Sequence, residues 1–351
     1  MRLWRRESRE GAFGGVRHPA PNRDVTSSIT RKITSRLGRS TISAAISLLF
    51  LALASFILYR LLRDADFAKV VSALKAQSPE RIALAGVLVI AGYITLTFYD
   101  LFALHALGWK KVPYSVAALA SFASSTIGHS LGAAVLTGGL VRLRIYSVWG
   151  LTVVDVAKIA FVTGMTFWLG NAFMLGGAAA FAPQAAAAVD HLPLWANRAI
   201  GLAGLAAIAA YLLWLAPRPR TVGRADWHIV LPNLRFTLLQ IGIGALDLTI
   251  ITTAMYVLLP SQPPVNFVMV MVPFLTATFL GTVSHTPGGL GVIEATMLLG
   301  LTQYPREELL ASLLTFRAVY FVLPLILATL SLGLRELRLL ARSAASPDTG
   351  E

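Results

Sequence analysis

Two short motifs place a histidine between a threonine and a glycine inside apolar parts of the chain. They are Thr126-Ile-Gly-His-Ser-Leu-Gly and Thr282-Val-Ser-His-Thr-Pro-Gly. The surrounding stretches without Asp, Glu, Lys or Arg are residues 112–141 and 248–293. The imidazole of His129 or His285 could titrate near neutral pH, or it could hydrogen-bond carbonyl groups that a broken helix leaves free.

An aspartate precedes each motif, Asp100 before the first and Asp247 before the second. An ionised residue at the centre of a bilayer costs roughly 2.5–3.5 kcal/mol on insertion scales. Each carboxylate therefore needs a partner or water. Both could face one cavity, where they would bind a cationic headgroup or relay protons, or they could hold two helices together. We take both aspartates and both histidines as candidate site residues.

Two arginines, Arg142 and Arg144, follow Gly138-Gly139 closely. A planar guanidinium group can bind a phosphate through two parallel hydrogen bonds, which suits a lipid headgroup. The same pair could instead be an ordinary orientation signal at the cytoplasmic side of the membrane. We take both arginines as candidates for phosphate binding.

Three further charged residues lie within or beside predicted spans. Lys158 could line the cavity, or it could pair with Asp155 on the same helix turn. Arg317 has no acid nearby in the sequence, and Glu294, just after the second break, is its natural partner. We therefore expect Glu294 and Arg317 to lie together and include Lys158, Glu294 and Arg317 among the cavity candidates.

Glycine and proline mark where the two apolar stretches should break. The expected break residues are Gly128, Gly132, Gly138, Gly139, Pro287, Gly288, Gly289 and Gly291. A nucleotide-binding loop is excluded because no βαβ pattern surrounds these glycines. The chain has no G-x-S-x-G or H-E-x-x-H motif, and it has no cysteine. We therefore expect no cofactor and no metal site.

The composition is that of a membrane protein. Hydrophobic residues make up 56% of the chain, charged residues only 13%, and the mean hydropathy is +0.68. A soluble domain carries roughly 25% charged residues. The net charge of +13 could suggest nucleic acid, but 10 of the 30 Lys and Arg residues lie in residues 1–40 and others in short loops. There they orient spans and attract anionic lipid, so we expect membrane lipids and no nucleic acid as partners.

The apolar segments predict an all-α polytopic fold with a basic tail (1–40), one transmembrane domain (41–340) and a short C-terminal tail (341–351). Full spans are expected at about 41–60, 82–107, 152–181, 195–216, 229–259 and 309–334. The first could alternatively belong to a cleaved signal peptide, although it is longer than the usual apolar core. Residues 61–81 mix charged and apolar residues as an interfacial amphipathic helix does.

The Lys and Arg distribution predicts the topology. With both termini in the cytoplasm, the basic loops all fall inside only if the broken segments, 114–141 and 265–302, are re-entrant hairpins. The first would open from the cytoplasm and the second from outside, which makes the two halves an inverted repeat. A full span through 114–141 would reverse everything after it. The basic 60–81 connection is the exception to the rule, because it must lie outside although it carries five Lys and Arg residues.

Several motifs, in this order, resemble the N-terminal membrane domain of the lysylphosphatidylglycerol synthetase family. They are Tyr99-Asp-Leu-Phe-Ala-Leu, Ser121-Phe-Ala-Ser-Ser-Thr-Ile-Gly-His, Thr137-Gly-Gly-Leu-Val-Arg-Leu-Arg-Ile-Tyr-Ser-Val-Trp-Gly-Leu, Thr166-Phe-Trp-Leu-Gly and Ser284-His-Thr-Pro-Gly-Gly-Leu-Gly-Val-Ile-Glu-Ala. The resemblance covers about residues 45–335. In that family the domain is regarded as a flippase for aminoacylated phosphatidylglycerol, and a cytosolic aminoacyltransferase domain follows it. Stand-alone relatives share the membrane domain, some in hopanoid or glycolipid pathways.

The resemblance implies a lipid translocator in the bacterial cytoplasmic (inner) membrane that moves a phospholipid such as aminoacyl-phosphatidylglycerol. No transferase domain follows before Glu351, so we expect a transporter and not an enzyme. Two alternatives stay open at this point. One is an accessory subunit for a separately encoded lipid-modifying enzyme, which would then be a partner. The other is a membrane-embedded enzyme with Asp and His as an acid–base pair.

Overall fold

The predicted spans form long helices. The computed structural model describes residues 66–345 except 217–220, 225–226 and 231–232; the predicted tail 1–40, the first span 41–60 and residues 346–351 lie outside this description. The helices that match predicted spans are α3 (Pro79–Ala106), α6 (Val153–Phe181), α8 (Leu194–Leu215), α9 (Leu234–Leu258) and the continuous helix Arg306–Arg335. Within the described residues, six helices are long and apolar enough to cross a membrane. The sixth is α10 (Phe267–Ser284), which belongs to the second broken segment.

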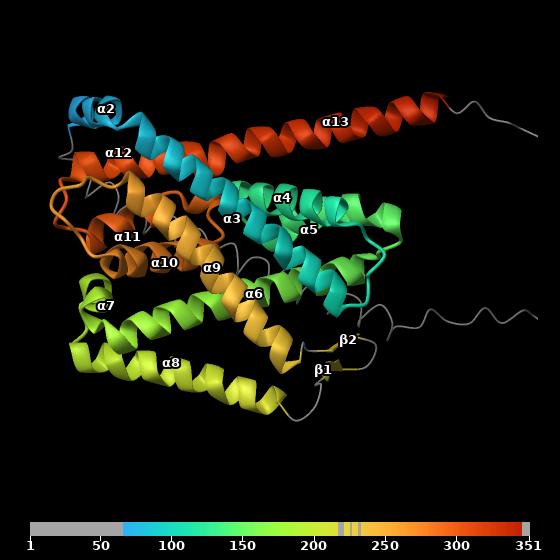
Figure 1. Cartoon of the computed structure of the whole chain (residues 1–351), viewed down its shortest axis with the longest axis horizontal. Coiled ribbons are helices and arrows are strands. Elements are labelled where there is room, and N and C mark those ends of the chain that lie inside the picture. The colour runs from blue at the N-terminus through green and yellow to red at the C-terminus, as the bar shows by residue number, and fades with distance from the viewer. Residues whose placement is uncertain (1–65, 217–220, 225–226, 231–232, 346–351) are drawn as a thin grey trace, which may run out of the picture. The chain divides into compact units, whose positions relative to one another are not determined.

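The last long helix combines three elements. It begins as α12 (Arg306–Arg317), widens into a π-helical turn (η3, Ala318–Val322) and continues as α13 (Leu323–Ala345). The helix therefore runs past the predicted span end at 334. Figure 1 shows α12 and α13 in one line, with α6 and α8 side by side below them.

Local sequence sets where the helices begin. Thr152 and Asp155 form a capping box at the start of α6: the Asp155 carboxylate accepts from the Thr152 backbone N–H at 2.9 Å and from its hydroxyl at 2.7 Å. Among the described ion pairs, none joins Asp155 to Lys158, because the cap already engages the carboxylate. Lys158 nevertheless acts on Asp155 through its charge, so the predicted couple is present as an electrostatic interaction without a direct ion pair. Asn233 caps α9 in a similar way, accepting from Phe236 at 3.0 Å.

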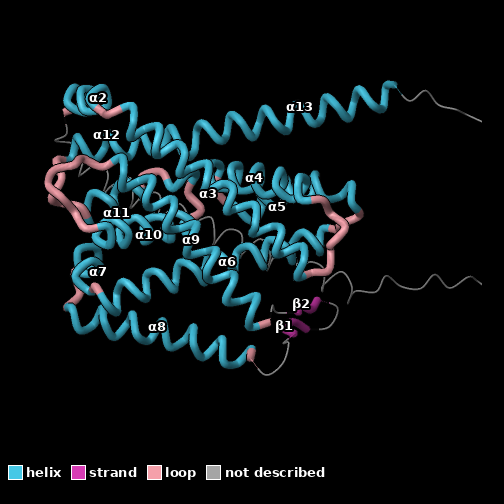
Figure 2. The backbone as a smooth tube through the Cα atoms, viewed as in Figure 1, coloured by secondary structure: helices cyan, strands magenta, loops and turns pink. Residues whose placement is uncertain are grey.

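Short elements connect the long helices. The amphipathic segment forms α2 (Phe67–Ala76), which packs on α12; beyond its end, the Thr315 hydroxyl donates to the Gln77 side chain at 2.6 Å. The sequence did not predict α7 (Pro183–Asp190) or the antiparallel strands β1 (Thr221–Arg224) and β2 (Trp227–Val230). Figure 2 shows this strand pair between α8 and α9, in a fold that is otherwise helical over the described residues.

Each broken segment forms a pair of antiparallel helices. The first pair is α4 (Tyr114–Leu131) and α5 (Ala134–Tyr146), followed by the 3-10 turn η1 (Ser147–Trp149). The second is α10 and α11 (Val292–Gly300), joined through the 3-10 turn η2 (Pro287–Gly289). In the first pair a Cβ on Gly128 would lie 3.1 Å from the Ala134 Cβ, and one on Gly138 would lie 2.8 Å from the Ser124 carbonyl oxygen. A side chain at Gly138 would therefore force the backbone apart, and one at Gly128 would fit only tightly.

The breaks lie at fewer residues than the sequence predicted. In the first pair the chain turns at Gly132 and Ala133, which have φ angles of 74° and 47°. Gly128 lies inside α4, and Gly138 and Gly139 lie inside α5, so these three pack helices or leave space instead of breaking them. His129 likewise lies in the last turn of α4.

The second break matches its prediction closely. Gly288, Gly289 and Gly291 all have positive φ, between 58° and 77°, which an L side chain rarely adopts. Pro287 begins η2, and His285 ends α10 with φ of 56°.

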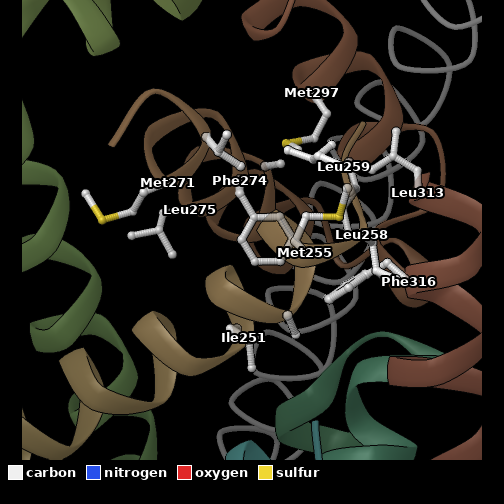
Figure 3. Close-up of a cluster of buried hydrophobic side chains, with 14 of the residues drawn as sticks. Ile251, Met255, Leu258, Leu259, Met271, Phe274, Leu275, Met297, Leu313 and Phe316 are labelled. Atoms are coloured by element: carbon white, nitrogen blue, oxygen red, sulfur yellow. The ribbon is translucent and has the colours of Figure 1, made fainter. Parts of the chain in front are cut away.

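A buried apolar cluster holds the second pair against the long helices. Figure 3 shows Met255 from α9, Phe274 from α10, Met297 from α11 and Phe316 from α12 packed together. The rings of Phe274 and Phe316 meet edge to face with centroids 5.3 Å apart. This cluster fixes α10 and α11 beside the full-length helices that line the site.

Candidate functional site

The two helix pairs meet at their tips. A Cβ on Gly132 would lie 2.5 Å from the His285 carbonyl oxygen and 3.1 Å from the Pro287 nitrogen. The turn of the first pair is therefore in backbone contact with the turn of the second, although about 150 residues separate them in the sequence. We call this contact the tip contact. It depends on Gly132 in the first turn, where a side chain would collide with the backbone of the second turn.

A cavity of about 410 Å³ lies beside the tip contact. Its walls come from α3, α6 and α9, from both helix pairs, and from Phe316, Tyr320 and Phe321 of the last long helix. Most of the lining is apolar, with a few polar groups, as in pockets of roughly 300–1,000 Å³ that bind small molecules. The two predicted broken segments thus share one cavity.

Asp247 contributes a buried carboxylate to this cavity. Its side chain lies on α9 and the residue is 4% exposed. The Tyr99 hydroxyl donates to Oδ2 at 3.2 Å, while Oδ1 is buried without a hydrogen-bond partner. Gly92 on α3 packs close to this oxygen, because a Cβ there would lie 3.8 Å from Oδ1 and 3.2 Å from Ile251 Cγ2. The carboxylate therefore keeps one acceptor atom that no described side chain satisfies.

Both motif histidines line the same cavity but in different environments. The Nδ1 atom of His129 is buried without a partner. His285 is exposed, and its Nδ1 lies 2.8 Å from the Val283 carbonyl oxygen, at the end of α10. His285 therefore caps a broken helix, as one of the two sequence interpretations has it, whereas His129 keeps a ring nitrogen available.

Asp100 forms a closed ion pair instead of facing the cavity. Arg142 donates from Nε to Oδ2 at 2.9 Å and from Nη2 to Oδ1 at 2.7 Å. The Tyr146 hydroxyl donates to Oδ2 at 2.8 Å, and Asp100 is fully buried. The expectation that both aspartates face one cavity is therefore wrong for Asp100, because the guanidinium group and the phenol take up its oxygens. The pair joins α3 to α5, and Arg142 also reaches the cavity wall.

Glu294 and Arg317 form a second ion pair, as the sequence predicted. Arg317 Nε donates to Glu294 Oε1, and Nη1 donates to the Gly288 carbonyl oxygen at 2.9 Å. Glu294 Oε2 accepts from the Gly291 backbone N–H at 2.8 Å. The guanidinium carbon lies 5.6 Å from the centre of the Phe321 ring. This pair ties the second turn to α12 and does not line the cavity.

The other two basic candidates lie away from the cavity. Arg144 is exposed in the last turn of α5, and Lys158 is partly exposed near the start of α6. Neither contributes to the cavity wall. Within the described residues, no group of three or more His, Asp or Glu side chains is placed to hold a metal ion.

The sequence profile described as lysylphosphatidylglycerol synthase TM region matches residues 41–328, most of the chain. The chain belongs to this family. An uncharacterized protein of Synechocystis sp., slr0712, is 33% identical over 73% of this chain and 80% of its own length. The inner membrane protein YbhN of Escherichia coli is 30% identical over 73% of this chain and 81% of its own length. A phosphatidylglycerol lysyltransferase of Staphylococcus haemolyticus is 38% identical over 18% of this chain and 8% of its own length.

Family membership and the six long apolar helices agree on a multi-pass membrane protein. The matched region covers every residue of the tip contact and the cavity. This lysylphosphatidylglycerol synthase TM-region protein therefore has its cavity inside the domain that defines the family.

Two site residues were missed by sequence reasoning. Tyr99 donates to Asp247, and Tyr146 donates to Asp100. Tyr99 lies next to Asp100 in the sequence, so it points to a different side of α3 and toward the other aspartate. A buried tyrosine beside a membrane carboxylate usually needs a hydrogen-bond acceptor, which was the available signal.

Proposed function

We propose that this protein translocates a phospholipid across the bilayer, with the headgroup passing through the cavity beside the tip contact. One observation carries the proposal: two broken segments, far apart in the sequence, meet at one cavity that contains a buried carboxylate oxygen and an imidazole nitrogen without partners. Polar groups of this kind inside a membrane domain characterise substrate pathways. The apolar remainder of the wall suits the acyl chains or the glycerol part of a lipid.

The proposal includes re-entrant helix pairs and an inverted repeat. The second arms support this placement, because α5 has 13 residues and α11 has 9. At a rise of about 1.5 Å per residue they reach roughly 20 Å and 14 Å, less than the roughly 30 Å of a bilayer core. Each pair would enter and leave on the same side of a bacterial inner membrane. Both termini would then lie on the cytoplasmic side of that membrane.

Headgroup recognition would use different residues of the cavity wall for the two charges. Asp247 would bind an amine, whereas His129 and Arg142 would face the phosphate. Arg142 already uses Nε and Nη2 for Asp100, which compensates its charge, so it would contribute a hydrogen bond from the remaining nitrogen. A zwitterionic phospholipid, including an aminoacylated one, fits this arrangement.

The tip contact offers the test of this function. Fluorescent phospholipid in proteoliposomes would be followed by its accessibility to dithionite. Gly132→Ala should abolish translocation, because the new Cβ would lie 2.5 Å from the His285 carbonyl oxygen and separate the tips. Gly139→Ala is the matched control, since nothing lies within 4 Å of its Cβ. Equal, normal rates in both variants would refute a pathway at the tips.

A further inference from the structure

Asp247 is the one acidic residue among those lining the cavity. The elements packed around it present hydroxyl groups and no further acid: Tyr99 and Tyr93 from α3 and Tyr320 from η3. Within the cavity wall, α4 adds His129, α5 adds Arg142 and the second turn adds His285. The residues that α6 presents there, such as Thr163, are uncharged.

The only described positive charge on the cavity wall is already matched. Arg142 forms a bidentate pair with Asp100, so its charge is compensated before Asp247 is considered. The second ion pair, Glu294 with Arg317, lies outside the cavity wall. Asp247 is thus a buried carboxylate with one hydroxyl donor on Oδ2 and no hydrogen-bond partner on Oδ1. An ionised carboxylate there requires a cation, and without one it takes up a proton.

We propose that a proton and the ammonium group of the lipid compete for Asp247, so that one lipid headgroup is exchanged for one proton. This inference rests on the proposed lipid translocation and names its coupling ion. A primary ammonium that enters the cavity donates to Oδ1, the Asp247 oxygen without a hydrogen-bond partner among the described residues. A proton neutralises the same oxygen when the headgroup is absent. The Asp247 carboxylate is therefore neutralised in both states, by the ammonium group or by the proton.

The exchange proceeds in four balanced steps. The ionised carboxylate binds the ammonium headgroup on one side of the membrane and releases it on the other. It then takes a proton from water on that second side and becomes a neutral carboxylic acid. After the cavity returns empty, the acid releases the proton to water on the first side. One headgroup moves one way, one proton moves the other, and no covalent bond other than O–H changes.

The test is lipid exchange driven by a pH gradient in proteoliposomes. The probe is fluorescently labelled phosphatidylethanolamine carrying the label on an acyl chain, with the membrane potential clamped by valinomycin and equal potassium. A gradient of about one pH unit should drive roughly a tenfold ratio between leaflets in the wild type. Reversing the gradient should reverse the ratio. Acyl-labelled phosphatidylglycerol, which lacks an amine, should show no gradient-driven ratio.

Asp247→Asn should remove all dependence on the gradient, because an amide binds no proton in this pH range. Glu308→Gln is the matched control, an exposed acid in the first turn of α12, and should behave like the wild type. A wild type that scrambles phosphatidylethanolamine equally in both gradient directions would overturn the exchange and leave translocation standing. Gradient dependence that persists in Asp247→Asn would assign the proton to another group and also overturn the inference.

A second readout does not need transport. Infrared difference spectra of the purified protein in nanodiscs should show a protonated-carboxyl band on acidification that Asp247→Asn lacks and Glu308→Gln retains. Phosphatidylethanolamine should diminish the band, and phosphatidylglycerol should not. If the band is present but neither lipid is translocated, the proposed function is refuted and Asp247 remains a proton-binding site. If lipid is translocated but the band is absent, only the proton-binding role of Asp247 is refuted.

Discussion

The buried pair of Asp100 and Arg142 should be costly to break but no more stabilising than an apolar pair of the same volume. Asp100 is fully buried, and its two oxygens receive Arg142 Nε at 2.9 Å and Nη2 at 2.7 Å, with Tyr146 at 2.8 Å. Removing one partner leaves the other charge buried and alone. Such a break costs about 3–5 kcal/mol. We therefore expect Asp100→Leu and Arg142→Met each to lower the free energy of unfolding by about that amount.

The double variant Asp100→Leu/Arg142→Met should recover most of the loss. An apolar pair of similar volume avoids the desolvation penalty, and such replacements are often neutral or stabilising by about 1–4 kcal/mol. Arg142→Lys keeps the charge but loses the planar two-bond contact, so it should lie between the wild type and Arg142→Met. Reversible unfolding in mixed micelles, followed by circular dichroism, gives the four corners of a double-mutant cycle.

The coupling energy between residues 100 and 142, taken from this cycle, tests whether the pair joins α3 to α5. Single losses below about 1 kcal/mol would mean that water or lipid reaches the pair, which contradicts its burial. Single losses of the expected size that simply add in the double variant would mean that each residue stabilises something else. Either result would refute the argument that α3 and α5 are joined by this pair.

The remaining predictions concern helix crossing and topology. Gly244→Ala should lower the free energy of unfolding by about 1–3 kcal/mol, because its Cβ would lie 2.5 Å from the Thr166 carbonyl oxygen on α6. Gly242→Ala, with nothing within 4 Å of its Cβ, should cost little, and equal losses in thermal unfolding would contradict the crossing argument. Val148 is 69% exposed, so a cysteine placed there by Val148→Cys should react with a thiol reagent. A membrane-impermeant reagent should label it in inside-out vesicles, where the cytoplasmic face is accessible, and not in right-side-out vesicles. Labelling only from outside would reverse the proposed orientation of the first helix pair.

Apolar length and the breaks could be read from the sequence because both follow from local rules. A run of about 20 apolar residues gives a span, and Pro287 with three nearby glycines gives a turn. The pairing of Glu294 with Arg317 was also accessible, since few charges lie in that half of the domain. The short helix α7 and the strand pair gave no periodic signal long enough to predict them.

The role of Asp100 could not be predicted, because it depends on which way α3 is rotated. Neighbouring residues on a helix point about 100° apart, so Tyr99 and Asp100 face different surroundings. Tyr99 reaches Asp247, and Asp100 reaches Arg142 on a helix 42 positions later. Sequence patterns showed that both aspartates need partners but not which partner each has. The different roles of Gly138 and Gly139 in α5 could not be predicted either. Only packing distinguishes them, because Gly138 faces the Ser124 carbonyl of α4 whereas nothing lies within 4 Å of a Cβ at Gly139.

The tip contact has a consequence for how this sequence can change over generations. A side chain at residue 132 can be accepted only if the backbone at 285–287 moves away, and that backbone cannot move alone because Gly288 is held by Arg317. A mutation at one turn is therefore deleterious unless the other turn has already shifted. In related sequences the two turns should therefore change together or both stay unchanged, so that positions about 150 residues apart covary.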